Sequence, residues 1–598
     1  GALCYRGVWP GTDILYEPRP SGLEYTLTLA PGADPARIRL RHSGRIELGP
    51  KGEILIATPL GTVSESRPRA YQAIGGRERE VESAFAVHGD GTYGFTLGAY
   101  NRSLPLVIDP TLSYSTFLDG GWGSTQGGVT DNGRAVSVDA AGAVYVAGST
   151  DSDFPFTAGA YGSSPRGQLD VFVSKLSADG STLLGSSILG GGDEDELGGM
   201  QIDASGNVYL IGETRSADFP TTLGAYDRTL NGAKDLFIAR LEASGASLGW
   251  STLLGGSGTE MDPRLAVDGA GDVVFTARTT DSSDLPITPG AFDAVWNDYE
   301  GFAGKISSAG TVLSGLTYLG LGHSFSTCVA VDGAGDIVVG GATFNFVFPA
   351  TPGAYQTSRN GVQDGFLMTR APDCTTLRWG TYFGGDGEEE IRSIAIEASG
   401  VIAFTGMLNA DTSTTFPTTP GAYQTTPVGP TFKEGFVARM SADGSTLLAG
   451  TYLGGMADDI PMQITLAPGG DLVVAGTTDQ PGFPVTAGAY DTTHNGGRDV
   501  FVARLSADVS TLVFSTFLGG ASSESSVAVA FDPAGAIVVS GTSATGTPAF
   551  PTTAGSFQPA STGSNEVFVS KLSSTGSSLL WSTFLGGTGS GDALARRR

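Results

Sequence analysis

Apolar and polar residues alternate with a period of two along most of this chain. The alternation is clear at residues 23–29, 37–41, 54–56, 85–87 and 93–97, and turns rich in Gly, Asp and Pro interrupt it. A period of two predicts strands that bury one face, as in antiparallel sheets. No segment has a convincing helical period, so the pattern predicts an all-β protein.

From about residue 113 onward the pattern recurs as a long repeat. Its most regular segment is Phe-Pro-x-Thr-x-Gly-Ala-Tyr, and successive copies are 63 to 68 residues apart. The copies begin at Phe154, Phe219, Leu285, Phe348, Phe416, Phe483 and Phe550. A fixed period of this length indicates one supersecondary unit that is used seven times.

Each repeat contains four predicted strands. In the first repeat these are residues 135–139, 144–148, 171–176 and 184–189, and an Asp-Gly turn joins the last two. Asp-Gly between alternating apolar runs is typical of a β-hairpin. Four antiparallel strands repeated seven times predict a seven-bladed β-propeller.

The ending of the fourth strand occurs once more than the repeat does. It is already present at Tyr114–Leu118, before the first full repeat, and it occurs last at Trp581–Gly587. A surplus strand at one end closes a propeller by pairing with the opposite end, which leaves no open sheet edge. We therefore expect residues 114–118 or 581–585 to pair across the two ends of the array.

These patterns divide the chain into three parts. Residues 1–112 do not repeat and are predicted to form a small β-sandwich-like module. Residues 113–587 are predicted to form the propeller, and residues 588–598 resemble the start of another loop, a truncated tail that ends in three arginines. The N-terminus lacks the pattern of a signal peptide, so we expect a processed product or a fragment.

Composition narrows the range of partners. The 598 residues include 61 acidic and 34 basic ones, for a net charge of −27, which repels nucleic acid. No apolar run approaches the length of a membrane-spanning helix. Cys4, Cys328 and Cys374 have neither metal-ligand spacing nor the even number of a disulfide framework.

Several coupled motifs point to a known family. They are Tyr-Ser-Thr-Phe-Leu-Gly-Gly, Val-Asp-x-x-Gly-x-Val-Tyr-Val-Ala-Gly-x-Thr, Asp-Phe-Pro-x-Thr-x-Gly-Ala-Tyr and Asp-Val-Phe-Val-x-Lys-Leu. Together they resemble the bacterial SBBP (seven-bladed β-propeller) repeats, and residues 1–110 resemble the β-rich module that commonly precedes them. The resemblance implies a secreted or surface-attached bacterial protein, and it supplies no catalytic residues.

An acidic residue enters the third strand of every repeat. The seven are Asp170, Asp235, Glu300, Asp364, Glu434, Asp499 and Glu566. They form either a ring that binds cations or sugars, or carboxylates that accept backbone N–H groups of the loop in their own repeat. Because a binding site is rarely needed seven times, recurrence favours the structural role.

A second acidic set follows the Gly-Gly pairs. It comprises Asp193–Glu196, Glu260 with Asp262, Glu388–Glu390, Asp458–Asp459 and Glu524. Calcium prefers several oxygen ligands together, so these loops leave calcium open as a bound ion. They lack the spacing of a dedicated calcium loop, which favours solvated charge. We assign no cofactor and no metal ligand.

The loop aromatic residues, such as Phe154 and Tyr161, have a structural and a functional interpretation. They either pin the long loop onto its sheet or form an aromatic binding surface, and their regular recurrence favours pinning. Binding residues are better sought where the repeat is broken. The third and fourth repeats depart most from the pattern, and their irregular residues are Trp296, Asp298, Tyr299, His323, Phe344 and Phe346. Aromatic rings beside polar groups suit a sugar or a protein side chain. These residues are either a binding cluster or drifted loop positions.

No catalytic constellation stands out. The four histidines, His42, His88, His323 and His494, have no metal-ligand spacing, and no Gly-x-Ser-x-Gly elbow is paired with a base. We expect a non-enzymatic extracellular or cell-surface scaffold that acts by adhesion, by glycan or protein binding, or by self-assembly. The alternative is a secreted lyase or glycosidase with convergent carboxylates at the propeller mouth.

Overall fold

The computed structural model divides the chain into two compact units, Gly1–Phe117 and Leu118–Arg598. It describes the whole chain apart from residues 1–2, 20–21, 42–44, 50–51, 53, 59–60, 66, 75–76, 89–91, 110–111, 114–129, 151–153, 155, 163–164, 321, 411–414, 430–431, 545–548, 562–564, 586–589 and 592–598. In these described residues the only helix is a three-residue 3-10 turn, and no helix there is long and apolar enough to cross a membrane. The protein is therefore all-β, as the alternation predicts.

The first unit contains three antiparallel sheets. Their strand orders are β1-β2-β3-β12-β8-β9, β10-β11-β4 and β13-β7-β6-β5. The strands are β1 (Leu3–Trp9), β2 (Thr12–Arg19), β3 (Gly22–Leu29), β4 (Leu40–Arg41), β5 (Arg45–Leu48), β6 (Ile54–Thr58), β7 (Gly61–Glu65), β8 (Arg69–Ile74), β9 (Arg77–Val81), β10 (Ser83–Val87), β11 (Thr92–Leu97), β12 (Leu106–Asp109) and β13 (Leu112–Ser113). Inward-facing residues such as Leu27, Tyr93 and Ile108 form one apolar core.

One predicted strand of this unit is shorter than expected. The alternation at residues 37–41 predicts a strand, but the structure has the 3-10 turn η1 (Pro35–Arg37) followed by only Leu40–Arg41 in β4. Asp34 caps the turn by accepting a hydrogen bond from the Ala36 N–H at 3.1 Å. Pro35 cannot donate to a strand ladder and its fixed φ suits the first position of a helical turn, so turn chemistry overrides the alternation here.

The second unit consists of four-stranded antiparallel sheets. Among the described residues, five of them are separate: β18–β21, β22–β25, β26–β29, β30–β33 and β34–β37. Their strands are β18 (Asp195–Ile202), β19 (Val208–Thr214), β20 (Asp235–Leu241), β21 (Leu248–Leu254), β22 (Glu260–Val267), β23 (Val273–Thr279), β24 (Glu300–Ile306), β25 (Leu313–Tyr318), β26 (Ser324–Val331), β27 (Ile337–Thr343), β28 (Asp364–Arg370), β29 (Leu377–Phe383), β30 (Glu389–Ile396), β31 (Ile402–Asn409), β32 (Lys433–Met440), β33 (Leu447–Leu453), β34 (Asp459–Leu466), β35 (Leu472–Thr478), β36 (Asp499–Leu505) and β37 (Leu512–Leu518). Each sheet corresponds to one sequence repeat, with its four strands in chain order.

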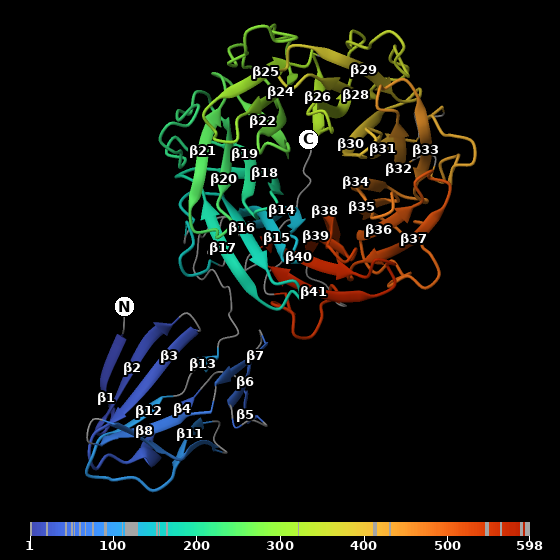
Figure 1. Ribbon diagram of the computed structural model, residues 1–598. Coiled ribbons are helices and arrows are strands. Elements are labelled where there is room, and N and C mark those ends of the chain that lie inside the picture. Colours follow the sequence, from blue (N-terminus) through green and yellow to red (C-terminus); the bar gives the residue numbers. More distant parts are fainter. Residues whose placement is uncertain are drawn as a thin grey trace. The chain divides into compact units, whose positions relative to one another are not determined.

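The first and last repeats share a sheet. Strands β14 (Thr130–Val138), β15 (Val144–Thr150), β16 (Asp170–Leu176) and β17 (Leu183–Leu189) make up the first repeat. Strands β38 (Glu524–Phe531), β39 (Ile537–Ala544), β40 (Asn565–Leu572) and β41 (Leu579–Leu585) make up the last, and β42 (Ser590–Gly591) joins the two. Figure 1 shows the sheets set around a common centre, an arrangement typical of a β-propeller, with the first strand of each repeat innermost.

The joining strand differs from the one that the sequence predicts. Residues 581–585 pair with β40 inside their own repeat, whereas β42 pairs in parallel with Thr130–Asp131 of β14 and with Asn565 of β40. The expectation that residues 581–585 pair across the ends is therefore wrong. Residues 114–118 lie outside the described residues. The tail after residue 587 thus contributes a strand of its own.

The recurring loop connects each sheet to itself and to the next. Its Phe stacks on the Phe of the third strand, with ring centroids 3.9 Å apart for Phe154 and Phe172 and 4.0 Å apart for Phe483 and Phe501. The aromatic residue that ends the repeated loop motif donates its backbone N–H to the hairpin of the following repeat. These bonds are Tyr161 to Gly245, Tyr226 to Gly310, Phe292 to Cys374, Tyr355 to Gly444, Tyr423 to Val509, Tyr490 to Gly576 and Phe557 to Gly180. The last bond runs from the seventh repeat to the first, so the same link joins the two ends.

At this hairpin the contacting residues of neighbouring repeats are complementary in size. The Trp379 indole of the fourth repeat lies against Gly444 of the fifth, and Trp581 of the seventh lies against Gly180 of the first. Each indole Nε1 donates to a hairpin carbonyl, at 2.9 Å to Ala442 and 3.0 Å to Ala178. A large ring on one side thus requires a hairpin residue without a side chain on the other.

At two of the three described junctions without the aromatic ring, the hairpin residue is larger; at the third, Gly245 stays a glycine opposite the repeat with Gly185. Cys374 lies against Gly315, and Val509 packs in one cluster with Ala449. Both adopt the left-handed conformation, with φ of 61° and 53°, that Gly adopts in the other hairpins. Filling the space offsets the backbone strain of a non-glycine residue at positive φ. Cys328 and Cys374 are buried thiols outside any disulfide, and burial raises the pKa of Cys374 to about 12.

Candidate binding site

The seven recurring carboxylates lie where the long loop enters the third strand. Asp170 accepts the N–H groups of Arg166 and Gly167 at 2.8 and 3.0 Å. Asp364 accepts those of Asn360 and Gly361 at 3.0 and 2.9 Å. Equivalent bonds reach Asp235, Glu300 and Asp499 from the loops of their own repeats. These carboxylates therefore hold the loop, and they are buried rather than presented to a ligand.

The structure brings members of the two acidic sets together in pairs. Each pair joins the third strand of one repeat to the first strand of the next, and the glycine that ends the fourth strand lies between the two carboxylates. A Cβ on Gly454 would lie 2.7 Å from Glu434 Oε1 and 2.8 Å from Asp459 Oδ2. The same arrangement holds for Asp170 with Asp195, Asp235 with Glu260, Asp364 with Glu389 and Asp499 with Glu524. The Gly-Gly motif of the repeat thus begins with a glycine because the carboxylates occupy the space of its side chain.

Burial and mutual repulsion make these carboxyl groups weak acids. Burial, followed by the charge of Asp235, raises the pKa of Glu260 to about 7. Burial and then the charge of Asp459 raise the pKa of Glu434 to about 7, and burial and Asp499 raise that of Glu524 to about 8. Two close carboxylates out of water cannot both be ionised at low cost. The pairs that contain Glu260, Glu434 and Glu524 therefore retain a proton up to about neutral pH.

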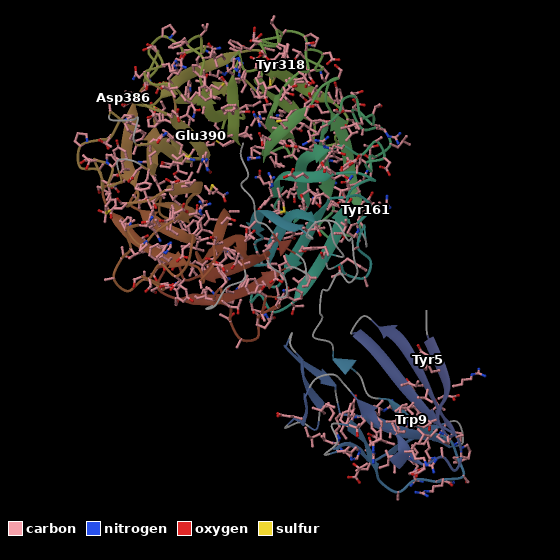
Figure 2. All side chains as sticks on the ribbon, turned by 180° about the vertical axis from the view of Figure 1, so that it is seen from behind. Tyr5, Trp9, Tyr161, Tyr318, Asp386 and Glu390 are labelled. Carbon is pink, nitrogen blue, oxygen red and sulfur yellow. The ribbon has the colours of Figure 1, made fainter. Side chains whose placement is uncertain are left out.

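The calcium interpretation of the second acidic set gains no geometric support. One member of each loop is buried in a carboxyl pair, and within the described residues no three His, Cys, Asp or Glu side chains are grouped to hold a metal ion. Figure 2 labels Glu390 on the inner side of the ring and Asp386 of the same loop farther out, so these two acids do not converge. Calcium binding stays a prediction without a site.

The junction between the third and fourth repeats breaks this pattern. Ser324 occupies the position that Asp195 or Asp459 has in other repeats, as its pairing with Thr343 shows. The Ser324 hydroxyl donates to the Thr343 hydroxyl at 2.7 Å. This junction therefore lacks the second carboxylate that the other described junctions have at this position.

At this junction aromatic rings alternate with guanidinium groups. Arg278 lies 5.9 Å from the Tyr299 ring and 5.6 Å from the Phe325 ring, and Phe325 meets Phe344 edge-on at 5.8 Å. Arg359 donates to the carbonyl of Phe344 and stacks 3.6 Å above the Phe346 ring. We call these six residues, Tyr299, Arg278, Phe325, Phe344, Arg359 and Phe346, the aromatic–arginine array.

Backbone strain is concentrated beside the array. Asp262, Asp298, Tyr299 and His323 all have left-handed φ, between 50° and 62°. The His323 N–H donates to the Asp298 carbonyl at 3.2 Å, and the Phe344 N–H to the His323 carbonyl at 3.3 Å. Residues held in such conformations cluster at binding and active sites, because the surroundings must offset the cost of the conformation.

A cavity of about 180 Å³ opens under the array. Its lining includes Asp262, Arg278 and Phe325, together with Arg264 and Glu390. The Arg278 Nε donates to Asp262 at 2.6 Å, so this guanidinium is held in place by an ion pair while its flat faces meet aromatic rings. A fixed guanidinium between rings is suited to recognise a planar or charged side chain.

The structure places five of the six residues that the sequence singled out on one surface and the sixth elsewhere. Asp298, Tyr299, His323, Phe344 and Phe346 lie together on the surface, and the rings of Tyr299 and Phe346 are 41% and 76% exposed. Trp296 is half-buried and packs against the core of its own sheet, so it does not belong to this surface. The sequence analysis missed Arg278, Phe325 and Arg359. A departure from the repeat could have revealed Arg278, because the equivalent residues of the neighbouring repeats are Glu213 and Ala342.

Comparison with known families gives a match within the first unit alone. Residues 1–111 match the family model described as "Domain of unknown function (DUF7948)". This match coincides with the module that the sequence predicts ahead of the repeats. No curated protein matches the chain. The resemblance of the repeats to the SBBP family stays a prediction.

Several solved structures are similar to this chain at low identity. A polysaccharide lyase, Uly1, is 11% identical, with 77% of this chain and 93% of that chain covered and a TM-score of 0.39. The Dos1 propeller is 9% identical, with 69% and 90% covered and a TM-score of 0.34. A protein of unknown function from Dyadobacter fermentans is 13% identical, with 57% and 88% covered and a TM-score of 0.33. At these scores the similarities carry no argument about function.

Proposed function

We propose that this protein is a non-enzymatic, extracytoplasmic binding protein, a seven-bladed propeller that holds a protein partner on the aromatic–arginine array. The observation that carries the proposal is the array itself, in which the exposed residues Tyr299, Phe344 and Phe346 lie beside fixed guanidinium groups at the junction where Ser324 replaces the second carboxylate. The extracytoplasmic location rests on the resemblance of the repeats.

Seven blades account for the strand pairing and for the links between repeats. Five separate four-stranded sheets and two runs of four strands in the shared sheet correspond to the seven sequence repeats. The bond from Phe557 to Gly180 equals the bonds between successive repeats, at 2.8 Å against 2.8 Å for Tyr490 to Gly576. A closed ring without free edges gives a rigid support on which a binding surface keeps its shape.

The surface favours a protein partner over a sugar. Beside Phe346 lies Val347, which is 77% exposed, and Val295 is exposed in the neighbouring loop. Aliphatic and aromatic side chains with arginine are typical of the energetic centre of protein interfaces. The net charge of −27 favours a partner whose surrounding surface is basic.

A library of displayed peptides tests this proposal. We expect the wild-type protein to enrich peptides that combine an aromatic or aliphatic residue with Lys or Arg. The double variant Tyr299→Ala, Phe346→Ala should bind those peptides at least about tenfold more weakly, since interface rings of this kind contribute 1–2 kcal/mol or more. Both rings are exposed, so the variant should keep its fold and its melting temperature.

Leu223→Ala is the matched control, because Leu223 is 92% exposed in the loop of the second repeat. It should leave peptide binding unchanged. Enrichment of no peptide, or equal binding by the double variant, would contradict the proposal. Array-dependent binding to a glycan panel would assign the surface to a sugar instead, and array-dependent dimers in light scattering would assign it to self-association.

A further inference from the structure

A second cavity lies at the centre of the ring. Its volume is about 250 Å³, and its lining comes from the first strand of every repeat: β14, β18, β22, β26, β30, β34 and β38. These innermost strands contact one another around the centre. The cavity is therefore an axial channel. It shares Arg264 and Thr327 with the smaller cavity under the array, but no residue of the aromatic–arginine array itself lines it.

The inner strands are bulged where they face this channel. The pairing of β14 with β15 skips Arg134, and that of β30 with β31 skips Arg392. The same irregularity occurs at the equivalent positions of the other first strands, for example at Thr327 and Met462. A bulge adds a residue to one strand and re-aims its side chain, so each inner strand can direct one extra side chain to the axis.

The charged residues that line the channel are all arginines: Arg134, Arg264 and Arg392. They come from the first, third and fifth repeats of a chain whose net charge is −27. Their side chains are held rather than mobile. Arg264 donates to the backbone carbonyls of Pro263 at 2.8 Å and Gly198 at 3.4 Å, and the Arg134 and Arg392 side chains are only 12% and 11% exposed.

The protein only partly satisfies these guanidinium groups. Arg134 pairs with Glu196, and Arg392 lies 3.5 Å from Glu390, yet neither glutamate lines the channel. The Nε atoms of Arg134 and Arg392 are buried and have no hydrogen-bond partner. Burial lowers the pKa of Arg392 to about 10, and burial together with the charge of Arg134 lowers that of Arg264. Buried cations with free donors are costly unless an anion joins them.

We propose that the axial channel binds a small multivalent oxoanion, held between Arg134, Arg264 and Arg392. Guanidinium groups present planar pairs of N–H donors that match the oxygens of carboxylate, sulfate or phosphate groups. Three of them from different repeats would hold an anion with several such oxygens. Arg264 also lines the cavity under the array, whereas Arg134 and Arg392 line the channel alone, so variants of these two arginines test the anion site separately from the protein-binding surface.

Titration calorimetry with citrate, sulfate and inorganic phosphate tests the site. A titration with chloride at the same ionic strength is the control, and its heat is subtracted to remove the effect of general charge screening. We expect at least one of the three anions to bind with a stoichiometry of one. Citrate binding alone would indicate a carboxylate ligand, and sulfate or phosphate binding would indicate a tetrahedral one.

The variants locate the binding. Arg392→Gln should weaken the bound anion at least about tenfold, the loss of one charge-assisted contact. Arg392→Lys should retain part of the affinity, because lysine keeps the charge but not the paired donors. Arg378→Gln, at an exposed position on β29 that pairs with Asp336, should bind as the wild type does.

If Arg392→Gln does not fold, Arg134→Gln takes its place with the same expected loss. Binding of none of the three anions above the chloride control would overturn the proposal. Equal affinity of the wild type and a folded Arg392→Gln or Arg134→Gln variant would overturn it as well.

Discussion

Gly444→Ala will destabilise the protein by about 2–5 kcal/mol. The added methyl group would clash with a neighbouring ring, and an alanine disfavours the left-handed backbone conformation of this hairpin position. Gly444 has φ of +67°, and a Cβ there would lie 2.5 Å from Cδ2 and 2.6 Å from Cζ3 of Trp379. The indole would have to move and give up its hydrogen bond to Ala442. Chemical denaturation at fixed pH measures the loss as a lower midpoint.

Gly421→Ala separates the two causes. Gly421 also has a left-handed φ, of +84°, but nothing lies within 4 Å of its missing Cβ. Gly421→Ala should lower the free energy of unfolding only through the unfavourable backbone conformation, by about 1–2 kcal/mol. The double variant Gly444→Ala, Trp379→Ala lacks the clash. Its loss of unfolding free energy should therefore be smaller, by at least about 1 kcal/mol, than the sum of the losses in the two single variants. Equal effects of Gly444→Ala and Gly421→Ala would refute the size match between repeats.

The free energy of unfolding will fall as the pH rises from about 5 to about 8.5, by several kcal/mol. The carboxyl pairs cause this fall. Their folded-state pKa values, about 7 for Asp195, Glu260 and Glu434, about 6 for Asp459 and about 8 for Glu524, exceed the ordinary values of carboxyl groups in an unfolded chain.

The sign follows from proton uptake. Between about pH 4 and 8 the folded state binds more protons than the unfolded state, so raising the pH through the folded pKa values removes stability. Below this window the trend reverses. Although burial opposes it, hydrogen bonds from Lys305 and the turn backbone lower the pKa of Asp268, and those from Lys571 and its turn lower that of Asp532. Stability should therefore be greatest on the acid side of neutrality.

Urea denaturation at several pH values measures this profile. Glu524→Gln removes one titrating group, so its stability relative to the wild type should rise between pH 5 and 8.5 by on the order of 3 kcal/mol. Glu242→Gln, at a half-exposed position paired with Arg240, should leave the profile unchanged. A wild-type stability that is flat or rises across this range would show that the carboxyl pairs do not retain protons in the folded state.

Much of the fold follows from local patterns in the sequence. The period of two, the Asp-Gly hairpins and the repeated loop predict four strands per repeat in chain order, which the sheets of the second unit have. These features are visible because each depends on neighbours within a few residues. The same repeat directs attention to positions that depart from it, such as Tyr299 and Phe346, which lie together on the surface.

Contacts between repeats were decided only by the tertiary structure. The carboxyl pairs, the aromatic–arginine array and the three channel arginines each combine side chains from separate repeats, so spacing along the chain gives no indication that they meet. A bulge of one residue turns Arg134 and Arg392 toward the axis, and Ser324 leaves one junction without a second carboxylate. Such outcomes depend on register and on which sheet packs next, because long-range packing fixes both.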